Sequence, residues 1–215
     1  LETDSLKLLT DALATLETRF DRLPAYDPTA DLDAMGDVLQ EVAERMTDNY
    51  PYPHPFYAGQ MLKPPHPMAR VAYMLALWIN PNNHALDGGR ASSFMEKEAV
   101  AEIAAMFGWQ TYLGHLTSGG TMANMEALWI AGRTQGDGQK IVASEQAHYT
   151  HSRLTDVLKI PYQSIPTDSR ARMDVAALEQ ALQQGDIGTV VVTLGTSAAG
   201  AVDPLPDILA LRQTY

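Results

Sequence analysis

The residues best suited to chemistry surround two adjacent glycines, in the stretch Thr117-Ser118-Gly119-Gly120-Thr121-Met122-Ala123-Asn124. An apolar run, Tyr112–Leu116, precedes it and apolar residues at helical spacing follow it, which predicts a strand, a glycine turn and a helix. Adjacent glycines let a ligand approach the backbone, and the first turn of a helix offers unpaired N–H groups at the positive end of its dipole. The pattern indicates a phosphate site, with Thr121 as a further donor; the alternative is a plain turn with a threonine as helix cap.

Two familiar nucleotide motifs are missing from this stretch. It has neither GxxxxGK[ST] nor GxGxxG, which argues against a nucleotide P-loop and against a dinucleotide turn.

A second candidate is the imidazole of His148, which follows the apolar run Lys140–Ala143. Its flat ring can stack on an aromatic ligand and can form hydrogen bonds through either nitrogen; a buried structural histidine is the alternative. His151 lies one helical turn further on and His115 lies on a nearby predicted strand, which raises the question of a metal. There is no HExxH and no carboxylate at ligand spacing, so we expect no metal site.

These candidates require a scaffold, and the second half of the chain alternates apolar strands with amphipathic helices. Strands are predicted at Lys140–Ala143, Tyr162–Ile165 and Thr189–Leu194, and helices at about 147–158, at 174–182 and from near Leu205. Such alternation predicts an α/β fold with parallel strands buried on both faces, whose ligands sit at the carboxyl ends of the strands. Three stretches fall at such ends: Ser118–Thr121, Ser144–His148 and Leu194–Ser197.

The first half of the chain is mainly helical. Amphipathic helices are predicted over residues 4–21 and over Leu32–Met46, with Asp31 near the cap of the second, and they could pack within the chain or on another subunit. A further helix is predicted over Met68–Ile79, and Ser93-Phe94-Met95-Glu96 has the spacing of a capping box, which gives Glu96 a structural role. The segment 50–61 is rich in proline and aromatic residues and is interpreted as a binding loop or as a stiff linker.

Composition limits the classes of partner. The 215 residues are 46% hydrophobic with a net charge of -11, so the chain can bury a core and repels nucleic acid and anionic lipid. There is no cysteine, which excludes disulfides and thiolate chemistry within the chain and favours the cytoplasm. No apolar run reaches the length of a membrane span and the N-terminus lacks a signal-peptide pattern, so a small-molecule ligand is expected.

Taken in order, several motifs resemble the group II pyridoxal-phosphate-dependent amino-acid decarboxylases. The resemblance runs from about residue 50 to the end of the chain and is carried by His54–Tyr57 with Gly59–Met61, Glu96–Gly108, Ser118–Asn124, Ser144–Thr150, Asp174–Leu178 and Thr193–Pro204.

The resemblance implies a fold type I enzyme of the aspartate aminotransferase superfamily, a homodimer that decarboxylates an L-amino acid. The fold class is then a PLP-dependent transferase-like large domain, mostly parallel sheet with flanking helices, incomplete here and preceded by an N-terminal helical segment. The expected division is a helical segment for packing or dimerisation (1–50), a substrate loop with a helix and a long loop (51–93), and the first part of the cofactor-binding domain (94–215).

The resemblance also implies roles for individual residues, with pyridoxal 5′-phosphate as cofactor. Gly120 and Thr121 would hold the phosphate, His148 would stack on the pyridine ring, and Thr196 would lie near the ring's phenolic oxygen or the substrate carboxylate. The residues expected to meet the substrate side chain are Phe56, Tyr57, Gln60 and Met61. The aromatic loop suits an aromatic amino acid, with tyrosine the first to try, while glutamate, aspartate and diamino acids stay open.

Two parts of the family pattern are not matched: the aspartate that pairs with the pyridine nitrogen and the Schiff-base lysine. The five lysines of the chain, Lys7, Lys63, Lys97, Lys140 and Lys159, all lie away from the matching position. We expect that the chain is the N-terminal part of a longer decarboxylase. A non-catalytic binding or assembly module, and another fold type I enzyme such as an aminotransferase or a carbon-carbon lyase, are the alternatives.

Overall fold

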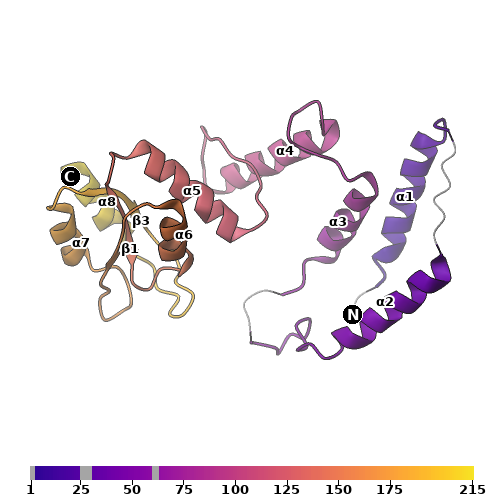
Figure 1. The fold of residues 1–215 in the computed structure, drawn as a ribbon, viewed down its shortest axis with the longest axis horizontal. Coiled ribbons are helices and arrows are strands. Elements are labelled where there is room, and N and C mark those ends of the chain that lie inside the picture. The colour runs from indigo at the N-terminus through magenta and orange to yellow at the C-terminus, as the bar shows by residue number, and fades with distance from the viewer. Residues whose placement is uncertain (1–2, 25–30, 60–62) are drawn as a thin grey trace. The chain divides into compact units, whose positions relative to one another are not determined.

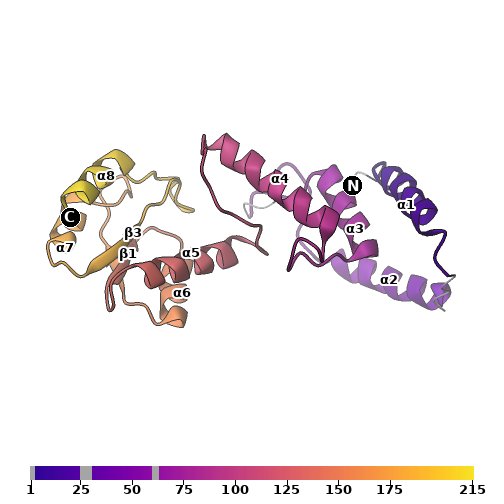
Figure 2. The ribbon, with the colours of Figure 1, turned by 90° about the horizontal axis from the view of Figure 1, so that it is seen from above.

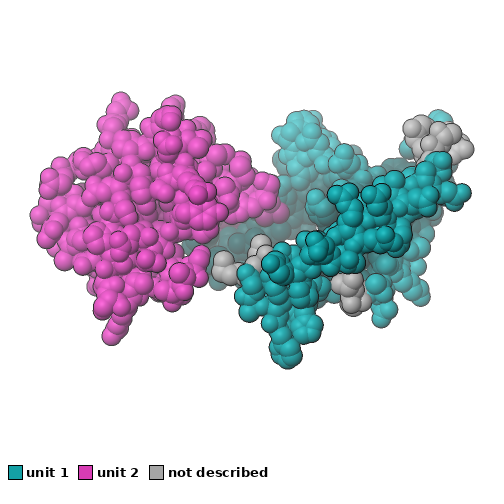
Figure 3. Space-filling model, turned by 60° about the horizontal axis from the view of Figure 1, so that its bottom comes forward, with its two compact units in different colours: residues 1–110 teal, residues 111–215 magenta. Residues whose placement is uncertain are grey.

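The computed structural model describes residues 3–24, 31–59 and 63–215. The chain divides into two compact units, residues 1–110 and 111–215, shown in two colours in Figure 3. The described part of the first unit is helical, and the second unit contains a parallel sheet with helices on both faces. The predicted boundaries at residues 50 and 93 stay predictions. No helix in the described ranges is both long enough and apolar enough to cross a membrane.

Helices α1 to α4 of the first unit are labelled in Figure 1; they are Leu6–Phe20, Leu32–Met46, Pro67–Ile79 and Arg90–Met106. Helices α1 and α3 pack together and bury Leu9 and Val71. Helix α2 has the predicted bounds, because the Asp31 carboxylate accepts a hydrogen bond from the Ala34 N–H (3.0 Å) and caps its first turn. None of the residues of α2 is buried within the described structure.

The predicted capping box at Ser93 and Glu96 is wrong, because α4 begins at Arg90 with Gly89 as its N-cap. The Ser93 N–H already donates to the Gly89 carbonyl (2.7 Å), so Ser93 lies inside the helix. Glu96 instead accepts a hydrogen bond from the side-chain amide of Asn83 (2.9 Å), in the loop before the helix. Its role is structural as expected, but the partner comes from tertiary packing.

The second unit has the element order α5 (Gly120–Thr134), β1 (Lys140–Ser144), α6 (Thr150–Leu158), β2 (Tyr162–Ile165), α7 (Val175–Leu182), β3 (Ile187–Val191) and α8 (Leu205–Thr214). The strand order is β2-β1-β3, and both pairs are parallel. The central strand β1 therefore has a neighbour on each edge. Ile141, for example, lies in register with Tyr162 of β2 and with Thr189 of β3. The predicted parallel sheet is confirmed, although β3 starts and ends earlier than predicted and α6 starts later.

Successive residues of β1 point to opposite faces of the sheet, as the strand period requires. Ile141 packs with Leu128 of α5 and Leu154 of α6, whereas Val142 packs with Leu178 of α7 and Ile208 of α8. Figure 2 shows α5 and α6 on one side of the strands and α7 and α8 on the other. The sheet is therefore covered on both faces, which explains the continuous apolar character of β1.

The strand predicted over Tyr112–Leu116 is absent, and this part of the chain has no regular structure. A strand needs an edge with which to pair, and in the described sheet only the outer edges of β2 and β3 are open; Tyr112–Leu116 pairs with neither of them. Leu113 is fully exposed (102%), so the apolar run is not buried by any described residue. The run has the composition of a strand, but a strand also requires a neighbouring strand, which the sequence pattern does not specify.

Candidate functional site

The start of α5 and the end of β1 lie at the same edge of the sheet. The far end of α5 lies beside the beginning of β3, where the Thr189 hydroxyl donates to the side-chain carbonyl of Gln135 (2.8 Å). Helix α5 therefore runs back from the carboxyl edge, and its first residue, Gly120, belongs to that edge. Parallel sheets of this kind bind their ligands there.

The first turn of α5 is uncapped. Its N-cap, Gly119, has φ 150° and ψ 174° and offers no side-chain acceptor, and the first helical hydrogen bond is from the Ala123 N–H to the Gly119 carbonyl (3.1 Å). In the described structure the N–H groups of Gly120, Thr121 and Met122 have no hydrogen-bond partner. The alternative prediction, a threonine cap, is therefore wrong, and an acceptor for these donors must come from a ligand or from water.

The space in front of these donors is open. A Cβ atom built on Gly119 or on Gly120 meets no heavy atom within 4 Å, and the side chain of Thr121 is exposed. A tetrahedral anion can thus approach the N–H groups and the Thr121 hydroxyl together, at the positive end of the helix dipole. The turn therefore offers hydrogen-bond donors and open space to a phosphate group such as that of pyridoxal phosphate.

His148 is exposed, which contradicts the alternative of a buried structural histidine at this position. Its ring packs on that of Tyr149, with centroids 4.3 Å apart and planes inclined by 31°. The guanidinium of Arg153 lies over the Tyr149 ring, 4.6 Å from the ring centroid. Since Tyr149 contacts one side of the imidazole, a flat ligand would stack on the other.

The buried histidine of this segment is His151, which is 8% exposed. Its Nδ1 has no hydrogen-bond partner in the described structure. Burial, with a further contribution from the neighbouring His148, lowers the pKa of the His151 imidazole below its usual range. Desolvation disfavours the charged ring, so burial favours the neutral form of the His151 imidazole.

Two residues that the sequence did not single out join the glycine turn to His148. Asn124, in the second turn of α5, donates from its side-chain amide to the hydroxyl of Thr150 (3.2 Å), the first residue of α6. That hydroxyl lies 2.9 Å from Nδ1 of His148. The only signal in the sequence is an amide near one helix start and a hydroxyl near another, which does not reveal the contact.

Thr196 lies in the loop that follows β3, and its side chain is buried (4% exposed). Its hydroxyl accepts a hydrogen bond from the Ala201 N–H (3.0 Å), and its own N–H donates to the Ala201 carbonyl (2.9 Å). The same loop is held by Asp203, a buried carboxylate that accepts hydrogen bonds from the N–H groups of Thr193 (2.8 Å) and Met173 (2.7 Å). The predicted role of Thr196 at the cofactor stays a prediction.

In the described ranges no group of three or more His, Cys, Asp or Glu residues is arranged to hold a metal ion. His115 pairs instead with Glu126 of α5, with 2.7 Å between Nε2 and Oε2.

The structure describes two of the four predicted substrate-contacting residues, Phe56 and Tyr57, both in the aromatic loop of the first unit. Phe56 is almost fully exposed (91%), whereas Tyr57 stacks on Tyr50 and meets Tyr52 edge to face. The side chain of Lys63, six residues later in the sequence, donates to the carbonyl of Tyr57. The other two residues, Gln60 and Met61, lie outside the described residues. Contact of the loop with substrate stays a prediction.

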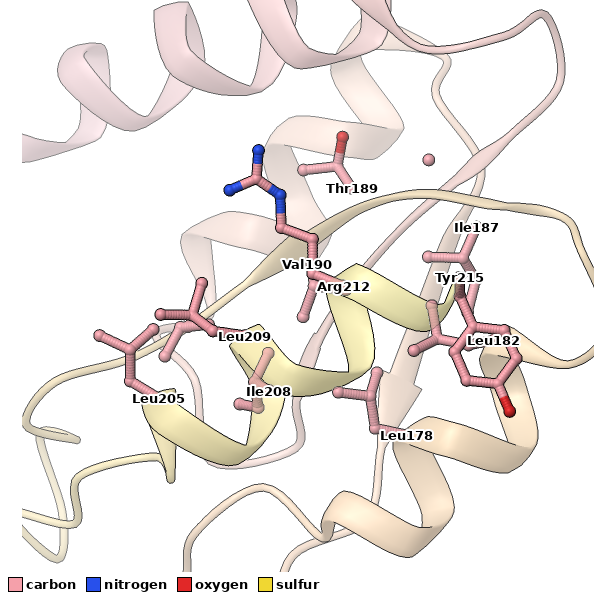
Figure 4. A pocket seen from close by; sticks show the side chains of 12 residues that line it. Leu178, Leu182, Ile187, Thr189, Val190, Leu205, Ile208, Leu209, Arg212 and Tyr215 are labelled. Carbon is pink, nitrogen blue, oxygen red and sulfur yellow. The ribbon is translucent and has the colours of Figure 1, made fainter.

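A cavity of about 450 Å³ lies on the face of the sheet covered by α7 and α8 (Figure 4). Its lining is mainly aliphatic, from Leu178, Leu182, Ile187, Val190, Ile208 and Leu209, with Arg212 and Tyr215 also present. None of Gly120, Thr121, His148 and Thr196 lines it, so it is separate from the candidate site.

The loop after β2 contains an ion pair with a defined response to pH. The Asp168 carboxylate accepts hydrogen bonds from Nε (2.9 Å) and Nη2 (2.7 Å) of Arg172. Those bonds, followed by backbone hydrogen bonds, lower the pKa of Asp168 to about 2. A carboxyl whose folded-state pKa is depressed contributes stability above its unfolded pKa of about 4, and the contribution is lost as the pH falls through the folded value.

We therefore expect the loop to loosen between about pH 4 and pH 2, which a carboxyl-detected NMR titration of Asp168 would follow. In the variant Arg172→Gln the pKa of Asp168 should rise toward its ordinary value. The matched control is Arg170→Gln, because Arg170 contributes only its backbone N–H (2.8 Å). Equal titration midpoints in the two variants would show that the guanidinium is not the cause.

The arrangement defines a class of protein. A parallel sheet whose carboxyl edge carries an uncapped, glycine-initiated helix and an exposed imidazole is suited to a planar ligand with a phosphate group. The comparison with known families agrees: the chain belongs to the pyridoxal-dependent decarboxylases, whose conserved-domain model matches residues 26–215.

Among curated relatives, the chain is 36% identical over 151 residues to a probable L-aspartate decarboxylase of Halobacterium salinarum, a match that covers 70% of this chain and 42% of the relative. It is 29% identical over 181 residues to a probable L-tyrosine/L-aspartate decarboxylase of Methanothrix thermoacetophila, covering 83% of this chain and 45% of the relative. The chain thus spans less than half the length of these relatives.

Solved structures show the same fold. Mouse CSAD in apo form superposes with a TM-score of 0.73 at 20% identity, over 93% of this chain and 45% of that one. Oryza sativa TDC with PLP and tryptamine superposes with a TM-score of 0.67 at 19% identity, over 100% of this chain and 56% of that one. The predicted fold type I architecture, present here in part, is confirmed.

Proposed function

We propose that this chain supplies the phosphate-binding and ring-binding half of the cofactor site of a pyridoxal-phosphate-dependent L-amino-acid decarboxylase. The observation that supports it best is the uncapped first turn of α5, where the N–H groups of Gly120, Thr121 and Met122 have no partner in the described structure. The family match and the names of the relatives support the reaction class.

When bound, pyridoxal phosphate supplies an electron sink that accepts the electron pair left as carbon dioxide departs. The residues of this chain would position it. The N–H groups at the start of α5 and the Thr121 hydroxyl bind the phosphate, which fixes one end of the ring. His148 then covers one face of the ring and excludes water from it. Thr196 lies on the loop after the neighbouring strand, from which it would approach the ring oxygen or the substrate carboxylate.

The first substrates to try are L-tyrosine and L-aspartate. Relatives named for these two substrates match the chain, and the exposed ring of Phe56 suits contact with a ligand. For Tyr57 the contacts with two neighbouring tyrosines and with Lys63 favour a scaffold role, so substrate contact would come from Phe56 first.

We also propose that the protein acts as a cytoplasmic homodimer. The apolar side chains of α2 support an interface, because this helix buries nothing within the described chain; Leu32, Met35, Val38, Leu39, Val42 and Met46 are all exposed. The complete lack of cysteine among the 215 residues is compatible with a reducing compartment.

Binding is tested with pyridoxine 5′-phosphate, which has the ring and the phosphate but needs no lysine. Calorimetry should show that the chain binds pyridoxine 5′-phosphate and does not bind pyridoxine, which lacks the phosphate. Thr121→Val should weaken binding about tenfold, because one hydrogen bond to a charged group is lost. The control is Thr134→Val at the other end of α5, whose hydroxyl bonds only to the Ile130 and Ala131 carbonyls. Equal affinity for both ligands would reject the phosphate site.

The reaction is tested on the protein that carries this chain, incubated with pyridoxal phosphate and each amino acid in turn. Release of carbon dioxide together with the corresponding amine is the expected result. A keto acid product would instead identify an aminotransferase. Cleavage of L-tyrosine with water to phenol, pyruvate and ammonia would identify a carbon-carbon lyase.

A further inference from the structure

We infer that Thr150 and Asn124 are positioning residues: they fix the orientation of the His148 imidazole and place its proton on Nε2 when the ring is neutral. Three distances in the structure support this inference. Nδ1 of His148 lies 2.9 Å from the Thr150 hydroxyl and 3.3 Å from the Thr150 N–H, and the Asn124 side-chain amide lies 3.2 Å from the same hydroxyl.

The direction of each hydrogen bond follows from what the groups can donate. A backbone N–H only donates, so the Thr150 N–H requires a lone pair on Nδ1. The Asn124 amide nitrogen also only donates, so it occupies a lone pair of the Thr150 oxygen and leaves the hydroxyl proton for Nδ1. Nδ1 is then the acceptor of two hydrogen bonds, and the proton of a neutral ring must be on Nε2.

Burial makes this arrangement hard to replace by water. Thr150 is 4% exposed, and Asn124 is half-buried between α5 and α6. A buried hydroxyl that lost its partner would pay the cost of its desolvation, so the chain of hydrogen bonds resists rearrangement. The opposite tautomer would bring an Nδ1–H group against the Thr150 N–H, two donors facing each other.

The same bonds join two parts of the site. Asn124 is one helical turn beyond Gly120, and Thr150 begins the helix that follows His148. A shift of the glycine turn would therefore be transmitted to the imidazole. If the proposed function holds, on which this consequence rests, the phosphate anchor and the stacking ring are set at a fixed separation, which suits a rigid cofactor.

The test is NMR of the 15N-labelled chain at a pH of about 9, where an ordinary histidine is neutral. Long-range correlations from the ring carbons distinguish the two tautomers, and His148→Gln assigns the signals. Nε2–H should dominate in the unsubstituted chain, and Thr150→Val should lower the ratio of Nε2–H to Nδ1–H about fivefold. Thr150→Ser, which restores the hydroxyl, should restore the ratio.

Two further variants separate positioning from folding. Asn124→Ala should change the ratio in the same direction but less, and it leaves Thr150 intact should the valine variant not fold. Ser152→Ala removes a hydroxyl from the same turn of α6, where it bonds only to the Tyr149 carbonyl (3.2 Å), and should change nothing. An unchanged ratio in both Thr150→Val and Asn124→Ala, with the fold intact, overturns the inference.

Binding of pyridoxine 5′-phosphate separates this inference from the proposed function. Thr150→Val should weaken binding a few-fold and Thr150→Ser should not. No binding by the unsubstituted chain would reject the proposed function, while the tautomer measurement would still decide the positioning role.

Discussion

Replacing Asp203 with alanine is expected to lower the free energy of unfolding of the sheet-containing unit by about 4 kcal/mol, because two hydrogen bonds to a charged group are lost. The carboxylate is 2% exposed and accepts hydrogen bonds from the N–H groups of Thr193, just after β3, and Met173, just before α7. Without it, both donors are left unpaired. The loop that carries Thr196 should then lose its anchor.

Hydrogen exchange at the Ile141 amide of β1 measures this change, since that amide lies in the central strand and exchanges only on large-scale opening. Asp207→Ala is the matched control: Asp207 is an exposed acid in the first turn of α8, where its loss should cost no more than about 1 kcal/mol. Similar effects of the two substitutions would refute a structural role for the buried carboxylate. Asp203→Asn should fall between them, because the amide keeps one acceptor.

Gly119→Ala is expected to destabilise the start of α5 by about 2 kcal/mol through backbone strain alone. The residue has φ 150° and ψ 174°, a conformation available essentially only to glycine, and the added methyl group would meet no neighbouring atom. Relief of the strain would rotate the peptide groups that precede Gly120 and turn their N–H groups away from a bound anion. Affinity for pyridoxine 5′-phosphate should fall along with stability.

Gly120→Ala provides the comparison. Gly120 is the first helical residue, its φ is not positive, and a methyl group there also meets no atom within 4 Å. By helix propensity, alanine at this position should leave stability unchanged or raise it by up to about 1 kcal/mol. Chemical unfolding of the two variants measures the difference. If both lose the same stability, crowding and not backbone conformation limits the turn.

The local elements could be predicted where the cause is local. The bounds of α2 follow from the Asp31 cap and its apolar spacing, and β2 occupies the predicted residues Tyr162–Ile165. The continuous apolar run of β1 correctly indicated burial on both faces. In each case the pattern that supports the prediction lies within a few residues of the sequence.

The errors occurred where a distant partner decides the outcome. Tyr112–Leu116 has the composition of a strand but pairs with no described strand. Glu96 has capping-box spacing, but its carboxylate accepts a hydrogen bond from the side-chain amide of Asn83 in the preceding loop. Neither outcome depends on residues close enough in sequence to form a pattern.

The sequence by itself determined the glycine-initiated start of α5, because the conformational freedom of glycine and the unpaired N–H groups of a helix start are local properties. These properties predict an anion site at this turn. The tertiary structure decided which groups complete it. Only the packing of α5 on α6 brings Asn124 to Thr150, and only the fold of the loop after β3 buries Asp203 between two backbone donors. Such contacts join residues far apart in the chain, so their spacing is set by the fold and has no local signature.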